Sequence, residues 1–148
     1  MTWDECIRDG WAKASFKDVQ RAKSLISISS VREKFVARSV VDGTSATSLF
    51  CEMYESLLEL CQAMAFMEGY NILNHACVTS FLEKQGLLDI ARDFDRFRKL
   101  RNGLNYYGRL LDVDFVGKSL NEMHSMSSGL KRLMAGRYAA LKDVIGRV

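Results

Sequence analysis

Residues 46–67 read ATSLFCEMYESLLELCQAMAFM. Apolar side chains recur through this stretch at steps of three and four residues, which is the spacing of one face of a helix. This broad apolar stripe consists of Leu49, Phe50, Met53, Tyr54, Leu57, Leu58, Cys61, Met64 and Ala65. The opposite face carries Glu52, Glu55, Glu59 and Gln62. The stretch therefore predicts a long helix with a wide buried face, around which the rest of the chain packs.

Helical periodicity extends along the whole chain, which contains no proline and no alternating runs bounded by Asn-Gly or Asp-Gly turns. We therefore predict no β-strands. Further helices are predicted at 17–39, 75–85, 87–107 and 113–144, with a short first helix after the capping-box pair Thr2 and Glu5. The connections are short, so neighbouring long helices are expected to run antiparallel. The predicted fold is an all-α, up-down bundle of four to five helices in a single domain, 1–148.

Two details of these helices are open to a structural test. The apolar positions of the second predicted helix are Val19, Ala22, Leu25, Ile28, Phe35 and Val36. We expect them to form its core face. The last helix is expected to kink or break within 125–129, where serine and glycine weaken the pattern.

The composition excludes several classes of protein. Hydrophobic residues make up 48% of the chain and the net charge is +3, so neither extended disorder nor a strongly basic nucleic-acid binder is indicated. No run of 18 apolar residues and no signal peptide is evident, which predicts a cytoplasmic protein without a membrane span. The four cysteines show no CxxC spacing and are predicted to be buried free thiols. The two histidines are far apart in the sequence, and no metal or other cofactor is expected.

Residues 98–108 read RKLRNGLNYYG and stand out from an ordinary solvated helix end. On a helix, Arg101 falls on the same side as the apolar stripe of Ile90, Phe94, Phe97 and Leu104. Burying a guanidinium without partners costs several kcal/mol. Arg101 is therefore expected to meet an interface, a ligand or a carboxylate, for which the glutamates of 46–67 are available.

A second, polar stripe on the same helix contains Asp95, Arg98, Asn102, Tyr106 and Arg109. Two interpretations of these residues remain open from their spacing alone. In the first, arginines pair with carboxylates and tyrosines pack as amphipathic residues. In the second, arginines supply charge and amides and phenols supply orientation for a bound phosphate.

The segment Arg101-Asn102-Gly103-Leu104-Asn105-Tyr106 resembles the signature of the HEPN domain family: an arginine, a polar residue, three to five variable residues and then usually a histidine. The order of the other segments is also similar to stand-alone prokaryotic HEPN proteins, including a subgroup that reads RNGxxYYG. These segments are EMYESLLEL, GYNILNH, FLEKQG and FDRFRKLRNGLNYYG. The likeness covers roughly residues 15 to 145.

The resemblance implies a helical bundle that forms a homodimer, with the two arginine-bearing helices side by side around one cleft. Active HEPN proteins are metal-independent ribonucleases, often toxins paired with a nucleotidyltransferase antitoxin, and other members only bind RNA or a partner. Carried over by position, Arg101 would bind the scissile phosphate with Asn102 as its polar companion. Further phosphate contacts are then expected from Arg98, Asn105, Tyr107 and Arg109, with Glu52, Glu59 and His75 as possible accessory residues.

The family histidine position holds Tyr106 in this chain. A phenol has an ordinary pKa near 10, which makes it a poor general base at neutral pH. The tyrosine that nucleotidyltransferase antitoxins modify falls on Gly108. His75, which follows the expected helix cap Asn74, is open to two interpretations. It either supplies the missing base or is an ordinary helix-start residue or hydrogen-bonded partner of the helix at 46–67.

Three functions therefore remain open. The first is an RNA-directed HEPN protein, either a ribonuclease toxin or a binding relative, with Arg101, Asn102 and Tyr106 at the phosphate. The second is a non-catalytic module that pairs with itself or with a nucleotidyltransferase, in which Arg101 is a structural ion pair. The third is a small nucleotide-binding helical protein.

Overall fold

The computed structural model describes residues 1–147, and of residues 105–107 it describes the backbone only. Helices make up 75% of the structure, so the predicted all-α class is correct apart from one pair of short strands. The helices are α1 (Trp3–Arg8), α2 (Val19–Arg38), α3 (Ala46–Met67), α4 (His75–Lys84), α5 (Leu88–Tyr107), α6 (Val113–Arg137) and α7 (Lys142–Gly146), with a 3-10 turn at Ala139–Leu141. In the part of the chain described, no helix is both long and apolar enough to cross a membrane.

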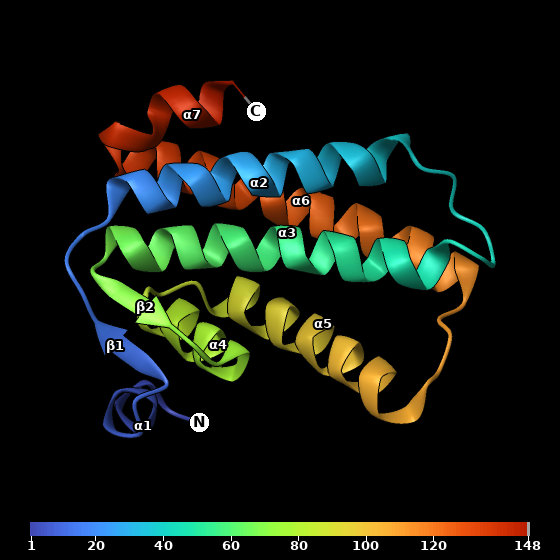
Figure 1. The fold of residues 1–148 in the computed structure, drawn as a ribbon, viewed down its shortest axis with the longest axis horizontal. Coiled ribbons are helices and arrows are strands. Elements are labelled where there is room, and N and C mark those ends of the chain that lie inside the picture. The colour runs from blue at the N-terminus through green and yellow to red at the C-terminus, as the bar shows by residue number, and fades with distance from the viewer. Residues whose placement is uncertain (148) are drawn as a thin grey trace.

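Helix α3 lies at the centre of the molecule. It contacts α2 and α6 over most of its length, and α4, α5 and β2 pack on its remaining sides. In Figure 1, α2 lies beside α3 and runs in the opposite direction, α6 lies behind them, and α5 runs below. This position explains why the quoted stretch is buried nearly all round, down to Ser56 and Glu59. A helix enclosed on all sides is apolar on all sides.

The helix ends follow the local signals in the sequence. Thr2 and Glu5 form the predicted capping box of α1, and the side chain of Asn74 accepts a hydrogen bond from the backbone of Ala76 at the start of α4. Helix α5 ends at Gly108, whose φ of +60° is in the left-handed region that glycine adopts without strain. The Asn74 cap fixes the end of α4 at which His75 of the candidate site lies.

The prediction that the chain has no strands was wrong. Strand β1 (Ala12–Ala14) pairs antiparallel with β2 (Tyr70–Ile72), with Ala12 opposite Ile72. More than fifty residues separate the two strands along the chain, so no local turn signal marks the pair. The pairing holds the N-terminal segment against the residues that lead into α4, at the left of Figure 1.

Two expectations about the long helices were also wrong. Ser125–Gly129 does not break α6, because Ser127 is buried there and donates a hydrogen bond to Glu33 of α2. The helix ends instead before Tyr138. In α2, Phe35 and Ile28 are exposed, and the core face carries Ser29, Ser30 and Glu33 beside Ala22, Ile26 and Val36. Polar side chains face the core in α2 because they find partners in α3 and α6.

The prediction of four free thiols was wrong for two of them. Cys6 of α1 and Cys77 of α4 form a disulfide, while Cys51 and Cys61 are free. The sequence separation of 71 residues gives no spacing motif, so only the docking of α1 on α4 brings the two sulfur atoms together. The bond therefore reinforces the attachment that the β1–β2 pair provides.

Candidate functional site

Arg101, the arginine of the segment that resembles the HEPN signature, lies on α5 where this helix packs against α3 and α4. Five side chains define what we call the Arg101 cluster: Tyr54 and Glu55 of α3, His75 of α4, and Arg98 and Arg101 of α5. These side chains are close enough to influence one another, since the charges of Glu55, Arg101 and Arg98 all affect the pKa of His75. The cluster therefore collects two guanidinium groups, an imidazole and a carboxylate from three helices.

Arg101 is half-buried, with 28% of its side chain exposed. Its Nη2 lies 3.4 Å from Oε1 of Glu55, a long contact for a charge-assisted hydrogen bond. Its Nε is buried and has no hydrogen-bond partner among the described residues. Buried N–H groups are rarely left unpaired, because an unmade hydrogen bond there costs about 1–3 kcal/mol. Glu55 is thus the carboxylate that the sequence led us to expect, but it satisfies Arg101 only in part.

Arg98 is held along its own helix and not by a glutamate of α3. Its Nε and Nη2 donate to Oδ1 of Asp95 at 3.0 and 2.7 Å. Asp95 also accepts from Thr79 of α4 and pairs with Lys99. Burial opposes ionisation of Asp95, but the hydrogen bonds from Arg98 and Lys99 prevail and lower its pKa. The Asp95 carboxylate therefore joins α4 to α5 and orients Arg98.

Glu52 and Glu59 do not belong to the cluster. Arg32 of α2 binds both, through Nη1 to Glu52 at 2.9 Å and through Nε to Glu59 at 2.6 Å. Burial raises the pKa of Glu59, although Arg32 opposes the shift. Of the glutamates available to Arg101, only Glu55 pairs with it, because the glutamate face of α3 is divided between α2 and α5.

His75 occupies the first position of α4 and lies within hydrogen-bond distance of Tyr54. Nδ1 of His75 lies 3.1 Å from the hydroxyl oxygen of Tyr54, which is fully buried. Burial raises the pKa of the Tyr54 phenol, so it keeps its proton. Burial also lowers the pKa of His75. The charge of Glu55 acts to raise this pKa, and the charges of Arg101 and Arg98 act to lower it further. We infer a neutral imidazole that accepts from Tyr54 at Nδ1 and carries its own proton on Nε2.

The other expected site residues lie on or beside α5. Asn102 is half-buried in α5, and Arg109 lies in the exposed segment between α5 and α6. The side chains of Asn105, Tyr106 and Tyr107 lie outside the described residues. The roles of these residues thus stay predictions. In the described residues, no group of three His, Cys, Asp or Glu side chains is placed to hold a metal ion.

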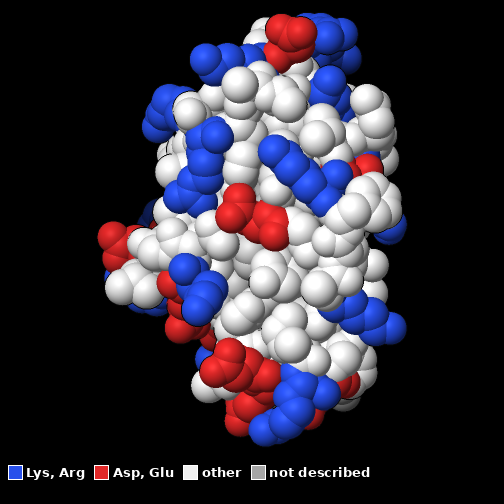
Figure 2. Space-filling model, turned by 90° about the vertical axis from the view of Figure 1, so that its left-hand side faces the viewer, with Lys and Arg blue, Asp and Glu red and all other residues white. Residues whose placement is uncertain are grey.

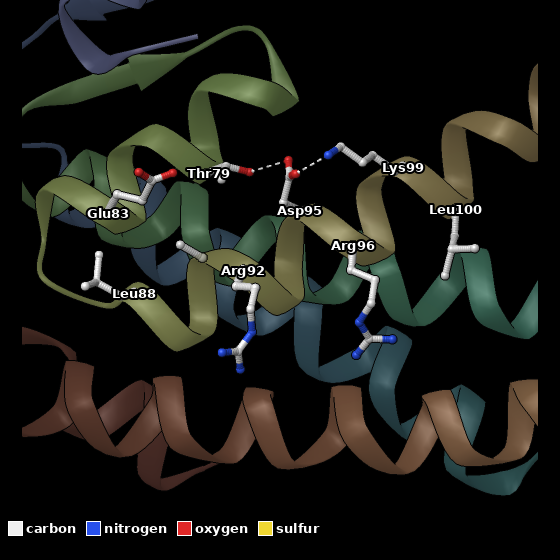
Figure 3. Close-up of a pocket in the computed structure, with 9 residues that line it drawn as sticks. Thr79, Glu83, Leu88, Arg92, Asp95, Arg96, Lys99 and Leu100 are labelled. Atoms are coloured by element: carbon white, nitrogen blue, oxygen red, sulfur yellow. Dashed lines mark hydrogen bonds and ion pairs between the residues drawn. The ribbon is translucent and has the colours of Figure 1, made fainter.

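A groove of about 680 Å³ runs beside the cluster between α4 and α5. Asp95 and Thr79 line it, so the carboxylate that orients Arg98 also forms part of the groove wall. Figure 3 shows Asp95 and Lys99 on one side of α5, and Arg92 and Arg96 pointing from it toward α6. Arg96 pairs there with Glu122. The groove gives the cluster a polar, charged extension along α5.

Sequence reasoning assigned Tyr54 to the apolar stripe and gave His75 as a possible hydrogen-bonded partner of the helix at 46–67. The contact between His75 and Tyr54 confirms that pairing, but Tyr54 was not named as the partner. The signal that was available is the residue type, since a tyrosine in a fully buried stripe requires a partner for its hydroxyl. The identity of that partner depends on the packing of α4 on α3, which no local pattern specifies.

Comparisons of the chain with protein-family models, with curated proteins and with solved structures give no match. The residues of the cluster are therefore the basis for a functional proposal.

Proposed function

We propose that this chain is an RNA-binding protein of the HEPN type, with Arg101 as the residue that contacts a backbone phosphate. The proposal includes an up-down bundle of α2, α3, α5 and α6 and a homodimer with the two copies of α5 side by side. Its support from sequence is the ordered set of segments that ends in RNGLNYYG. Its support from geometry is the Arg101 cluster.

The observation that carries the proposal is the incomplete pairing of Arg101. A structural ion pair would use both edges of the guanidinium on short, well-aligned contacts. Arg101 instead makes one 3.4 Å contact and keeps a buried Nε–H without a partner among the described residues. Because Glu55 occupies only one long contact, a phosphate oxygen would bind to the exposed part of this guanidinium. Arginine is the residue that typically binds phosphate in this way.

The neighbouring residues fit a phosphate better than they fit a proton-transfer site. Arg98 is oriented by Asp95 and adds a second positive charge. His75 in its Nε2–H form is a hydrogen-bond donor, and its lowered pKa keeps it neutral. With Tyr106 at the family's histidine position, the chain offers donors in place of a general base. We therefore propose RNA binding, and rank cleavage below it.

RNA would approach over α5 and not over the face shown in Figure 2. On that face basic side chains are scattered between uncharged residues, and acidic and basic side chains lie together at the lower end, where α1 lies. A backbone track requires basic groups that follow one line. The groove beside the cluster, which Lys99 lines, is the better path for the neighbouring nucleotides.

The second candidate is a non-catalytic pairing module, in which Arg101 has a structural role and the partner is another copy or a nucleotidyltransferase. The observation that favours it is the Arg101–Glu55 ion pair itself. The two candidates differ in what loss of the guanidinium does. In the first candidate RNA affinity falls and stability changes little, and in the second stability falls and RNA is irrelevant.

The experiment is fluorescence anisotropy of a labelled single-stranded RNA and of a tRNA pool, in EDTA, with wild type, Arg101→Ala, Arg101→Lys and Arg8→Ala. Arg8 is an exposed arginine of α1 and controls for loss of one charge. We expect Arg101→Ala to weaken binding about tenfold and to reduce the salt slope by about one. We expect Arg8→Ala to stay within about twofold of wild type. Equal affinity of wild type and Arg101→Ala would overturn the proposal, and a lowered melting temperature in that variant would favour the pairing module. Gel analysis of the same RNA reports cleavage.

A further inference from the structure

A second site lies between α2 and α6, and none of the Arg101 cluster residues lines it. It is a cavity of about 430 Å³, within the range of small-molecule pockets. Its apolar lining includes Val36 of α2, Met53 of α3 and Leu120 of α6, and its polar lining includes Glu33 and His124. Met53 is fully buried whereas His124 is 66% exposed. The cavity is thus apolar in its depth and polar at its mouth.

Glu33 anchors the polar end. Its Oε1 accepts from Nδ1 of His124 at 2.7 Å, and its Oε2 accepts from Ser127 at 2.6 Å and from Lys131 at 3.2 Å. Burial opposes ionisation of Glu33, but the hydrogen bond from Ser127 and the charge of Lys131 prevail and lower its pKa. An ionised carboxylate only accepts, so the Nδ1 atom of His124 carries a proton.

This arrangement leaves His124 Nε2 for a ligand, because it makes no hydrogen bond to any described residue. When the imidazole is protonated, Nε2–H is a donor and His124 adds a positive charge. Lys131 already balances the charge of Glu33. A protonated His124 is therefore the one charge that this network leaves uncompensated. An anionic group at the mouth would neutralise it through a charge-assisted hydrogen bond.

We propose that the α2–α6 cavity binds a small monocarboxylic acid with an apolar chain. The carboxylate accepts from His124 Nε2–H, and the acid's proton resides on that nitrogen. The chain extends past Val36 and Leu120 toward Met53. The ligand class follows from the order of the lining, in which a donor lies at the exposed mouth and apolar side chains lie in the buried depth.

The first test is an NMR titration of the intact protein with octanoate. The chain contains only two histidines, His75 and His124, so the two imidazole signals report the two sites separately. We expect octanoate to shift the His124 signals in a saturable manner and to leave those of His75 in place. Acetate has the head group without the chain, and octanol has the chain without the charge. Both should bind at least about tenfold more weakly than octanoate.

Two glycines of α6 supply matched variants. Gly117 lines the cavity and a Cβ added there meets no atom within 4 Å, so Gly117→Leu adds an apolar side chain at the cavity wall from a position where its first carbon has open space. Gly129 also has open space at its Cβ but does not line the cavity, so Gly129→Leu is the control. Both changes favour the helix.

We expect Gly117→Leu to weaken octanoate binding at least about tenfold and Gly129→Leu to leave it within about twofold. His124→Gln should weaken it about tenfold through loss of the charged donor. The proposal is overturned if octanol binds as tightly as octanoate, if the His124 signals do not move, or if Gly117→Leu binds like wild type. None of these outcomes bears on RNA binding at Arg101.

Discussion

The hydroxyl oxygen of Tyr54 lies 3.1 Å from Nδ1 of His75. This contact joins the most apolar helix of the molecule to the first residue of α4. In the tautomer inferred above, it leaves the proton of His75 on Nε2. A neutral histidine that accepts at Nδ1 already carries its proton on Nε2. It could take up another proton only at Nδ1, by losing the hydrogen bond from Tyr54 and becoming charged in a half-buried position. The relationship thus favours a donor role for His75 over the base that a ribonuclease needs.

The titration of His75 tests this assignment. Its folded-state pKa is lowered, so it contributes stability that is present above about pH 6.5 and is lost as pH falls toward the folded value. We expect NMR titration to place the His75 midpoint below that of an unfolded histidine, with nitrogen shifts of the Nε2–H tautomer at neutral pH. In Tyr54→Phe the preference should weaken to that of a free histidine side chain. A mainly Nδ1–H signal in wild type would contradict the inferred hydrogen-bond direction.

Neutralising Glu55 is expected to strengthen RNA binding. In Glu55→Gln the carboxylate no longer offsets the charge of Arg101, with which it forms a 3.4 Å pair. We expect RNA affinity to rise by about three- to tenfold at low salt, which corresponds to a gain of about 1 kcal/mol. Anisotropy at two salt concentrations measures the gain. Glu52→Gln is the matched control because Arg32 holds Glu52. Equal gains in both variants would indicate a general charge effect.

Loss of Arg32 is expected to destabilise the fold. Glu59 is buried, its Oε2 has no partner among the described residues, and its Oε1 depends on Arg32. Arg32→Ala should cost about 1–3 kcal/mol in the free energy of unfolding at pH 7. Burial already raises the pKa of Glu59, so protonation relieves the isolated charge and the deficit should shrink as pH falls toward 4.5 and below. Urea unfolding at pH 7 and pH 4.5 checks this.

The partner variant distinguishes electrostatics from packing in that experiment. Adding Glu59→Gln to Arg32→Ala removes the unpaired charge and should restore part of the lost stability at pH 7. If the double variant is no more stable than Arg32→Ala, the stem of Arg32 and not its charge is what α2 and α3 require.

The Cys6–Cys77 disulfide is expected to contribute about 4 kcal/mol to stability, since it closes a loop of 71 residues. Thermal melts of the wild type with and without a reductant measure this contribution. The Cys6→Ala, Cys77→Ala double variant should match the reduced protein and should not respond to the reductant. Thiol labelling of the unreduced, unfolded wild type should find two reactive cysteines, Cys51 and Cys61, and labelling of four would contradict the bond.

Periodicity predicted the long helices because each buries a face whose spacing is visible locally. Helix α3 has the bounds expected from its sequence, and α5 begins one residue from its expected start. The core face of α2 was misjudged because Ser29 and Glu33 are buried against partners on α3 and α6. The periodicity of hydrophobic residues contains no information about hydrogen-bond partners on other helices, such as Ser56 for Ser29 and Ser127 for Glu33.

The candidate site was predictable to a similar depth. The position of Arg101 on the apolar side of α5 indicated a buried guanidinium, and the structure provides Glu55 for it. The choice of Glu55 over Glu52 and Glu59 depends on how α2 and α5 divide the surface of α3. The approach of His75 to Tyr54 depends on how α4 docks. Both are relations between helices, and no single segment of sequence contains them.

The disulfide divides the chain into a closed covalent ring, residues 6–77, and an open tail. The ring contains α2 and α3 and their exposed connection at Gly43. A single protease cut at that connection would leave one covalently continuous molecule until a reductant separates the pieces. The Arg101 cluster straddles the division: Tyr54, Glu55 and His75 belong to the ring, and the arginines of α5 belong to the tail. The disulfide therefore restricts the movement of the ring that carries Tyr54, Glu55 and His75. The arginines of α5 lie outside the ring, and α5 is positioned on it by the chain that continues from α4 and by non-covalent contacts.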